Sequence, residues 1–189
     1  MVGLDMIIVT PLDINNSALV DEVAGVLHHG FAGISDAWPD SATARAEVHA
    51  HSQAHHISLV AIAHHHVVGW IAANPQYHGN AWELHPLVVA PHARQQGIGR
   101  RLVTALCDEL RLRGAQTLFV WCDDESHATT LSHTTLYPNP VAHLATFHTR
   151  PPHAGGFYLK LGFALSGVLP NANGPGKPDI LFVLPLTDA

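Results

Sequence analysis

The chain has 189 residues, of which 47% are hydrophobic and 13% are charged, a composition typical of folded globular proteins rather than disordered ones. Its net charge of −6 argues against nucleic acid as a partner. Residues 1–9 lack the basic segment and apolar run of a signal peptide, and the longest apolar stretch, 57–73, is interrupted by three histidines. We therefore expect one cytoplasmic domain over residues 1–189 that does not bind membranes.

Hydrophobic periodicity and capping residues predict the elements of the N-terminal half. Asn16 or Ser17 is expected to cap a first helix that Gly30 ends, and Ser41 is expected to cap a second helix. The predicted elements are a strand over 6–12, helices to about residue 29 and about residue 54, strands over 58–63 and 67–73, and a central strand from about residue 81.

The segment 82–114 predicts a strand, a glycine turn and an amphipathic helix ended by Gly114. Gly97 and Gly99 allow backbone amides to converge on a ligand, and together with the helix N-terminus these amides predict an anion site. The spacing excludes two common phosphate binders. A dinucleotide fingerprint needs a third glycine where Leu102 stands, and the Gly-Lys-Ser/Thr of a P-loop is absent from the sequence.

This segment resembles motif A of the GNAT superfamily of acetyl-CoA-dependent N-acetyltransferases, written Leu-x-Val-x-Pro-x-x-Arg/Gln-x-x-Gly-x-Gly/Ala. Every position is filled in register by Leu87, Val89, Pro91, Arg94, Gly97 and Gly99. The resemblance implies an α+β fold, in which a mixed, mostly antiparallel sheet of about seven strands is flanked by helices and splayed at the acetyl-CoA site. The stretches 82–89, 136–138 and 173–180 look most like bacterial aminoglycoside 6′-N-acetyltransferases.

The C-terminal half is predicted to contain a buried strand over 117–122, a helix over 153–161 and strands over 163–169 and 180–186. Between the first strand and the helix lies a polar insertion, 123–150, with one short helix expected around 141–147. The family normally makes this connection with far fewer residues. Because long loops in compact domains are usually functional or mobile, we expect the insertion to form part of the acceptor site.

Several residues match the acetyl-CoA site of the family. The amides of Gln95 to Gly99 are expected to bind the pyrophosphate, helped by Arg94 and Arg100. By register, the Leu87 amide would face the thioester carbonyl, and Val89 would hold the pantetheine arm. The full set expected to bind acetyl-CoA is Leu87, Val88, Val89, Arg94, Gln95, Gln96, Gly97, Ile98, Gly99 and Arg100.

Three side chains are candidates for proton transfer. Glu83 and His85 lie four and two residues before Leu87, so alternation predicts that all three share one strand face. Glu83 matches the glutamate base of histone acetyltransferases in the family, and His85 matches the histidine base of arylalkylamine acetyltransferases. Either group could take the proton of an ammonium substrate. Tyr158 matches the tyrosine that protonates the departing sulfur, although each of the three could instead serve packing or internal bonding.

Carboxylates favour a cationic acceptor. Asp123, Asp124 and Glu125 follow the strand 117–122, and Asp179 enters the last strand. Together with Glu83, they are the candidate acceptor-binding residues, although an acidic turn can also be merely solvated.

The 17 histidines raise the question of a metal site. Pairs such as His51 and His55 have i, i+4 spacing, but no cysteine or carboxylate accompanies them in sequence. We therefore expect no metal.

The sequence as a whole predicts an acetyltransferase that acts by direct attack in a ternary complex, with acetyl-CoA as co-substrate. The expected acceptor is the 6′-amine of an aminoglycoside antibiotic, which would make the protein a resistance factor. Another small amine, a polyamine or a peptide is the alternative acceptor. A non-catalytic acetyl-CoA sensor is the alternative of another class, and a homodimer is left open.

Overall fold

The structure is a computed structural model that describes residues 7–187. These residues fall into two compact units, one that ends at Gln116 and one that begins at Thr117. Met6, the predicted start of the first strand, lies outside the described residues, as does most of the segment 1–9. Within residues 7–187, no helix combines the length and the apolar character needed to cross a bilayer.

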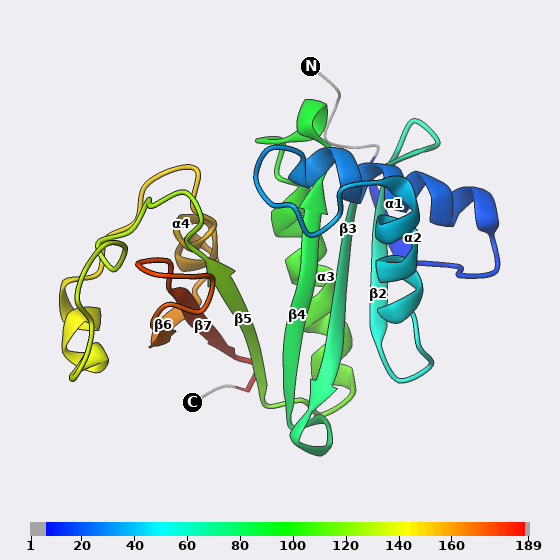
Figure 1. Cartoon of the computed structure of the whole chain (residues 1–189). Coiled ribbons are helices and arrows are strands. Elements are labelled where there is room, and N and C mark those ends of the chain that lie inside the picture. The colour runs from blue at the N-terminus through cyan, green and yellow to red at the C-terminus, as the bar shows by residue number, and fades with distance from the viewer. Residues whose placement is uncertain (1–6, 188–189) are drawn as a thin grey trace. The chain divides into compact units, whose positions relative to one another are not determined.

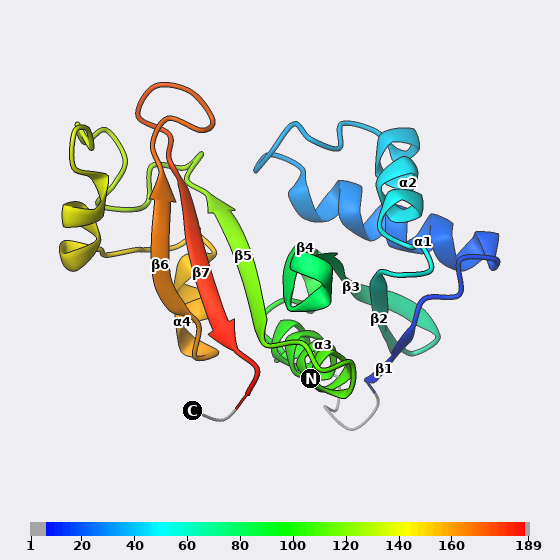
Figure 2. The ribbon, with the colours of Figure 1, turned by 90° about the horizontal axis from the view of Figure 1, so that it is seen from below.

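The N-terminal unit is an antiparallel sheet with helices on both faces (Figures 1 and 2). Its strands pair in the order β1-β2-β3-β4. The predicted hairpin at the histidine triplet is confirmed, with His64 and His65 in its turn. The elements are β1 (Ile8–Pro11), α1 (Ser17–Phe31), α2 (Ser41–Ala50), β2 (Ile57–Ala63), β3 (His66–Gln76), η2 (Tyr77–Gly79), β4 (Ala81–Val89), η3 (Pro91–Ala93) and α3 (Ile98–Leu112).

The helix caps confirm one sequence prediction and correct another. Asn16 caps α1, since its side chain accepts from the Leu19 amide at 3.2 Å. The cap of α2 is Asp40 rather than Ser41, because the Asp40 carboxylate accepts from the Thr43 amide at 2.7 Å. This helix ends at Ala50, four residues earlier than predicted. Ser52 contributes to the early end, since its hydroxyl donates to the Val48 carbonyl.

Two apolar layers cover the sheet of this unit. On one face, α1 and α2 pack around Trp70, which is fully buried and donates from its indole nitrogen to Ser58. On the other face lies α3, which approaches β3 so closely at Gly69 that a Cβ there would lie 3.0 Å from Leu102. Each large apolar side chain buried on these helices contributes roughly 1.5–3 kcal/mol. These side chains on α3 are Ile98, Leu102, Leu106 and Leu110.

Gly30 does not end α1 as predicted, because the helix runs to Phe31. Gly30 is buried, and a Cβ at this position would lie 2.3 Å from the Val88 side chain of β4. The residue is therefore needed for the close approach of α1 to the sheet, and its place near the end of the helix is secondary.

The C-terminal unit is built on an antiparallel sheet in the strand order β5-β7-β6. Its elements are β5 (Thr117–Asp123), η4 (Pro140–Thr146), α4 (Gly155–Lys160), β6 (Ala164–Leu169) and β7 (Asp179–Pro185). The helix predicted over 153–161 is shorter, since α4 begins at Gly155 and ends at Lys160. The Gly155 amide donates to His153 Nδ1 at 3.0 Å, so Nε2 carries the ring proton and faces the Cys122 carbonyl.

The packing of α1 predicts opposite effects for two glycines in one helix. Gly30→Ala should lower the free energy of unfolding by about 1–3 kcal/mol, because the new methyl group overlaps Val88. Gly25→Ala adds a methyl group that meets no atom within 4 Å among the described residues outside the backbone of its own helix, so it should raise the free energy of unfolding by up to about 1 kcal/mol. Denaturant unfolding of both variants measures the difference. Equal effects would contradict the close-packing role of Gly30.

Candidate functional site

The turn between β4 and α3 presents backbone amides at the start of a 15-residue helix. Gln95 and Gly97 both adopt left-handed backbone conformations, with φ of 63° and 80°. No side chain caps α3, and its first turn contains no acidic residue. The first amides of the helix therefore point outward at the positive end of its dipole, which is the arrangement of an anion site.

Arg94 holds this turn in place. Its Nε donates to the Val89 carbonyl at 3.2 Å, and its Nη2 donates to the Gly30 carbonyl at 2.5 Å. These bonds fasten the turn to the end of β4 and to the last turn of α1. Since Arg94 already bonds two backbone carbonyls, Arg100 is the better placed cation for a bound anion. Arg100 is exposed on the first turn of α3.

A β-bulge in β4 changes which side chains share a face. Leu84 pairs with Ala73, but Leu87 pairs with Ile71, so β4 advances three residues where β3 advances two. Glu83, opposite Asn74, therefore lies on the face of the sheet that α1 and α2 cover, whereas Leu87 lies on the α3 face. The prediction that Glu83, His85 and Leu87 share one face is wrong, because simple alternation does not survive the extra residue.

The bulge places His85 beside Glu47 of α2 and His51, the C-cap of that helix. Glu47 Oε1 lies 3.3 Å from His85 Nε2 and 2.9 Å from His51 Nε2. On its other side, His51 Nδ1 lies 2.8 Å from the Asn74 side-chain oxygen. We call these three residues the Glu47–His51–His85 cluster. It is half-buried, with side-chain exposures of 23% for Glu47, 13% for His51 and 47% for His85.

The cluster is strongly coupled electrostatically. Hydrogen bonds from His51 and then from His85 hold the pKa of Glu47 far below its usual range, against the opposing effect of burial. Burial acts to lower the pKa of His51, but its bonds to Glu47 and Asn74 outweigh this effect and raise it. The charge of Glu83 acts on His51 in the same direction. Glu83 and His85 are thus brought together within one charged network.

Sequence reasoning missed Glu47, Asn74 and the role of His51. The contact between Glu47 and His51 could have been predicted, because the two residues have the i, i+4 spacing of neighbours on a helix. His51 and His55 have the same spacing, but α2 ends at Ala50 and His55 lies beyond it. Asn74 and His85 reach the cluster through strand pairing, which local spacing does not reveal.

Asp124 of the C-terminal unit is fully buried and organises the insertion. Its carboxylate accepts from the Ala128 amide at 2.7 Å, from the amide and hydroxyl of Thr129, and from the Ser132 hydroxyl. Burial acts to raise the pKa of Asp124, but these hydrogen bonds outweigh it and lower the pKa. Both carboxylate oxygens of Asp124 are thus used by the loop, so its predicted contact with an acceptor stays a prediction to which these bonds lend no support.

The other predicted acids of this unit lie where β5 and β7 begin or end. Asp123 pairs with Asp179 across the two strands and accepts from the Asn173 side chain. Glu125 forms an ion pair with Lys177 at 2.8 Å. The structure thus brings Asp123 and Asp179 together, whereas the charge of Glu125 is partly neutralised.

Tyr158 lies on α4 and is 5% exposed. Its ring packs edge-on against Phe163. Burial raises the pKa of Tyr158 well above its usual value, so the hydroxyl keeps its proton. Burial likewise raises the pKa of the Cys122 thiol, and that of Cys107 to about 11, so neither cysteine supplies a thiolate at neutral pH.

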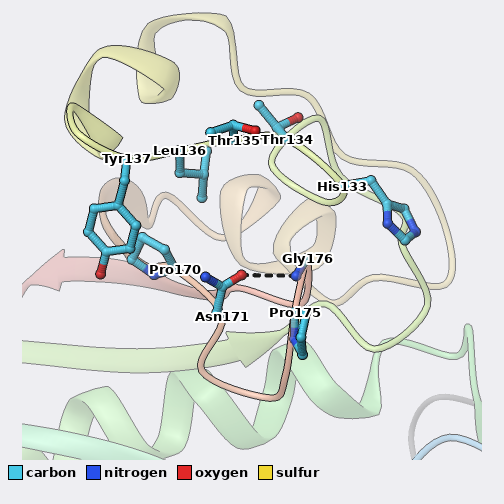
Figure 3. A pocket seen from close by; sticks show the side chains of 9 residues that line it. All are labelled: His133, Thr134, Thr135, Leu136, Tyr137, Pro170, Asn171, Pro175 and Gly176. Atoms are coloured by element: carbon cyan, nitrogen blue, oxygen red, sulfur yellow. Dashed lines mark hydrogen bonds between the residues drawn. The ribbon is translucent and has the colours of Figure 1, made fainter.

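The insertion lines an open cavity of about 390 Å³ in this unit (Figure 3). One wall is the segment 133–137 and the other is the loop between β6 and β7. Within that loop, the Gly176 amide donates a hydrogen bond of 2.9 Å to the side-chain oxygen of Asn171. The volume suits a small molecule. The lining residues are His133, Thr134, Thr135, Leu136, Tyr137, Pro170, Asn171, Pro175 and Gly176.

Known proteins resemble the chain over most of its length. The sequence profile of the acetyltransferase (GNAT) family matches residues 27–133, more than half of the chain. A crystal structure of an aminoglycoside 6′-N-acetyltransferase complexed with coenzyme A is 37% identical, with a TM-score of 0.88 over 96% of this chain and 98% of that one. A sequence comparison with curated proteins gave no significant match.

Two further solved structures agree with these findings. The aminoglycoside 6′-N-acetyltransferase from Enterococcus faecium is 37% identical, with a TM-score of 0.87 over 96% of this chain and 98% of that one. A type Ii aminoglycoside 6′-acetyltransferase is 33% identical, with a TM-score of 0.75 over 96% and 99%. Together with the seven strands found in residues 7–187, these likenesses confirm the predicted fold class.

The bonds of Asp124 predict a pH-dependent contribution to stability. Asp124→Asn should lower the free energy of unfolding by about 2–3 kcal/mol at neutral pH, because it removes the charge that four donors share. The folded-state pKa is lowered, so the stabilisation is present above the unfolded value of about 3.9. It is lost as the pH falls through the folded pKa. Urea unfolding of both proteins across the acidic range tests this.

Asp123→Asn is the matched control, since Asp123 is exposed and receives one bond from Asn173. Its effect should stay below about 1 kcal/mol. A difference between wild type and Asp124→Asn that does not shrink in acid would contradict the role given to the carboxylate.

Proposed function

Since this chain belongs to the GNAT family of acetyltransferases, we propose that it acetylates the 6′-amine of an aminoglycoside. It is an N-acetyltransferase whose co-substrate is acetyl-CoA. The observation that carries the choice of acceptor is the 37% identity to aminoglycoside 6′-N-acetyltransferases over nearly the whole of both chains. On this proposal residues 1–189 form one acetyltransferase domain, and its activity confers antibiotic resistance in the cytoplasm.

The turn between β4 and α3 fits the pyrophosphate of acetyl-CoA. Apart from its chain neighbours, no atom of residues 7–187 lies within 4 Å of a Cβ placed at Gly97, so the space above the turn is open to a ligand. The amides of Gln95 to Gly99 and the first turn of α3 would bind the phosphates, with Gln96, Ile98 and Arg100 in the same segment. Leu87, Val88 and Val89 would align the pantetheine arm along β4 through their backbone groups.

Bound acetyl-CoA supplies the thioester that the amine attacks. We assign Glu83 as the base that accepts the amine proton on its carboxylate. His85 was the alternative, but its Nε2 already faces the Glu47 carboxylate at 3.3 Å, which favours Glu83. Tyr158 is assigned as the donor of a proton to the leaving sulfur, since burial keeps its hydroxyl protonated.

Direct attack in a ternary complex is favoured over a covalent enzyme intermediate. An acyl-cysteine would need a reactive thiolate, and burial keeps Cys107 and Cys122 protonated. For the cationic acceptor, we assign Glu83, Asp123 and Asp179 to binding, with Glu125 in a minor role because it pairs with Lys177. The insertion 123–150 would supply one wall of the acceptor site, an assignment that the cavity in Figure 3 supports.

The charge of −6 favours cationic small molecules and disfavours nucleic acid. A homodimer stays a prediction that sedimentation can test.

The acceptor can be tested by following CoA release with aminoglycosides, polyamines, arylalkylamines and peptides. We expect turnover with aminoglycosides that carry a free 6′-amine and none with analogues in which this position is a hydroxyl. Glu83→Gln keeps the side-chain volume but removes the base, so kcat/KM should fall on the order of 10²-fold or more. Its effect on acetyl-CoA binding should be small, because the base acts on the acceptor.

His85→Gln is the matched comparison. A larger loss for His85→Gln than for Glu83→Gln would exchange the roles of the two residues. Turnover with polyamines or peptides and none with aminoglycosides would replace the proposed acceptor. Acetyl-CoA binding without turnover of any acceptor would favour a sensor.

The acetyl-CoA site can be tested with two glycines at opposite ends of α3. Gly97→Val places a side chain above the turn, so acetyl-CoA binding measured by calorimetry should be lost. Gly114→Val is the control, because Gly114 has nearly the same φ, 76° against 80°, and equally open surroundings. Both variants should show similar backbone strain in thermal unfolding. Equal loss of acetyl-CoA binding in both would mean that strain, not position, is responsible.

A further inference from the structure

From the geometry of the Glu47–His51–His85 cluster, we infer that it is a binding site for a divalent transition-metal ion of the zinc class. The cluster offers two imidazole nitrogens and one carboxylate oxygen, and these three atoms lie within 4.8 Å of one another. The inference rests on these side chains alone and does not depend on the proposed acetyl transfer.

The distances in the cluster suit a shared ion. Zinc binds nitrogen and oxygen ligands at about 2.0–2.2 Å, so two ligands of a tetrahedral ion lie about 3.3 Å apart. Glu47 Oε1 lies 2.9 Å from His51 Nε2 and 3.3 Å from His85 Nε2. Glu47 and His51 project from successive turns at the end of α2, and His85 projects from the bulge of β4. The side chain of His85 is 47% exposed, so solvent reaches this side of the cluster.

Asn74 gives the cluster the outer support that is typical of metal sites. A histidine that binds a metal usually donates its second ring N–H to a fixed acceptor, which sets the tautomer and the ring orientation. His51 Nδ1 lies 2.8 Å from Asn74 Oδ1, so Nδ1 carries a proton and Nε2 is directed at the cluster. In the metal-free protein, Nε2 also holds a proton that Glu47 accepts. A metal ion would replace that proton and release it to solvent.

The donor set selects the class of ion. Two histidines and one glutamate, with a fourth position toward solvent at His85, are the ligands of three-residue zinc sites. Magnesium and calcium prefer oxygen ligands throughout, so they are poor candidates. A second group of histidines, the exposed turn of His64, His65 and His66, competes as an explanation of any zinc binding. Adjacent residues cannot all direct their rings at one ion, so the turn offers at most a weaker site.

The inference can be tested on untagged protein with Zn²⁺ in calorimetry and Co²⁺ in absorption spectroscopy. We expect one Zn²⁺ per chain and an intense visible Co²⁺ band, which reports a four-coordinate site. Glu47→Gln combined with His51→Asn should abolish both signals. Asn74→Ala should weaken Zn²⁺ binding about 10–100-fold, because it removes the orienting acceptor and leaves the ligands in place.

Two controls separate the cluster from the other histidines. His49→Ala, exposed on the same helix, and replacement of the triplet 64–66 by alanine should leave the affinity and the Co²⁺ band unchanged. The inference would be overturned if wild type bound no Zn²⁺ or if the Glu47/His51 double variant bound it as tightly. Loss of binding on replacement of the triplet would also overturn it and assign the metal to the turn. Circular dichroism of each variant confirms that it is folded.

Discussion

The extra residue in β4 is the constraint on which the arrangement of the N-terminal unit most depends. Because His85 and Pro86 together stand opposite Ala72, the alternation of side chains shifts by one position along the strand. Glu83 and His85 face the side of α1 and α2, and Leu87 and Val89 face the side of α3. In a regularly paired strand, Glu83, His85, Leu87 and Val89 would all lie on one face. The bulge separates them, so that the two ionisable residues lie on one face and the two apolar residues lie on the other.

The face that carries Glu83 and His85 is shaped by its neighbours. Glu47 and His51 of α2 surround His85 with a charged network, and the Trp38 ring lies 6.1 Å from the His85 ring. Half-burial strengthens these interactions relative to fully exposed ones. The same network occupies Nε2 of His85 with the Glu47 carboxylate, which is why Glu83 is the stronger candidate for proton transfer. The contacts of Glu47 with His51 and His85 therefore support both the choice of Glu83 as the base and the inference that the cluster binds a metal ion.

A single buried carboxylate organises the first part of the insertion in the C-terminal unit. Asp124 bonds to backbone and hydroxyl groups over residues 128–132, and so replaces the regular pairing that such a long loop lacks. The segment that follows lines the cavity, so a buried charge supports a surface suited to a small ligand. Leaving such donors unpaired would be costly, which explains why a charged residue is fully buried here.

Much of the protein is determined by local sequence. The periodicity of 98–110, the left-handed Gly97 and Gly114 and the cap at Asn16 act within a few residues, so the turn, α3 and the start of α1 follow from local geometry. The motif around this turn also identified the family. Asp40 was missed as a cap because Ser41, its neighbour, has the same capping chemistry.

Other features were decided by contacts between residues far apart in sequence. A bulge depends on how two strands pair, so the face of Glu83 could not be derived from β4 alone. The need for glycine at position 30 comes from its close approach to Val88, which is distant along the chain. The environment of His51 likewise comes from Asn74 and His85, which are also distant in sequence. Asp124 looked like one of three equivalent surface acids, and its neighbours Asp123 and Glu125 remain at the surface. Burial and hydrogen-bond satisfaction belong to the folded chain, so tertiary structure alone distinguished Asp124 from them.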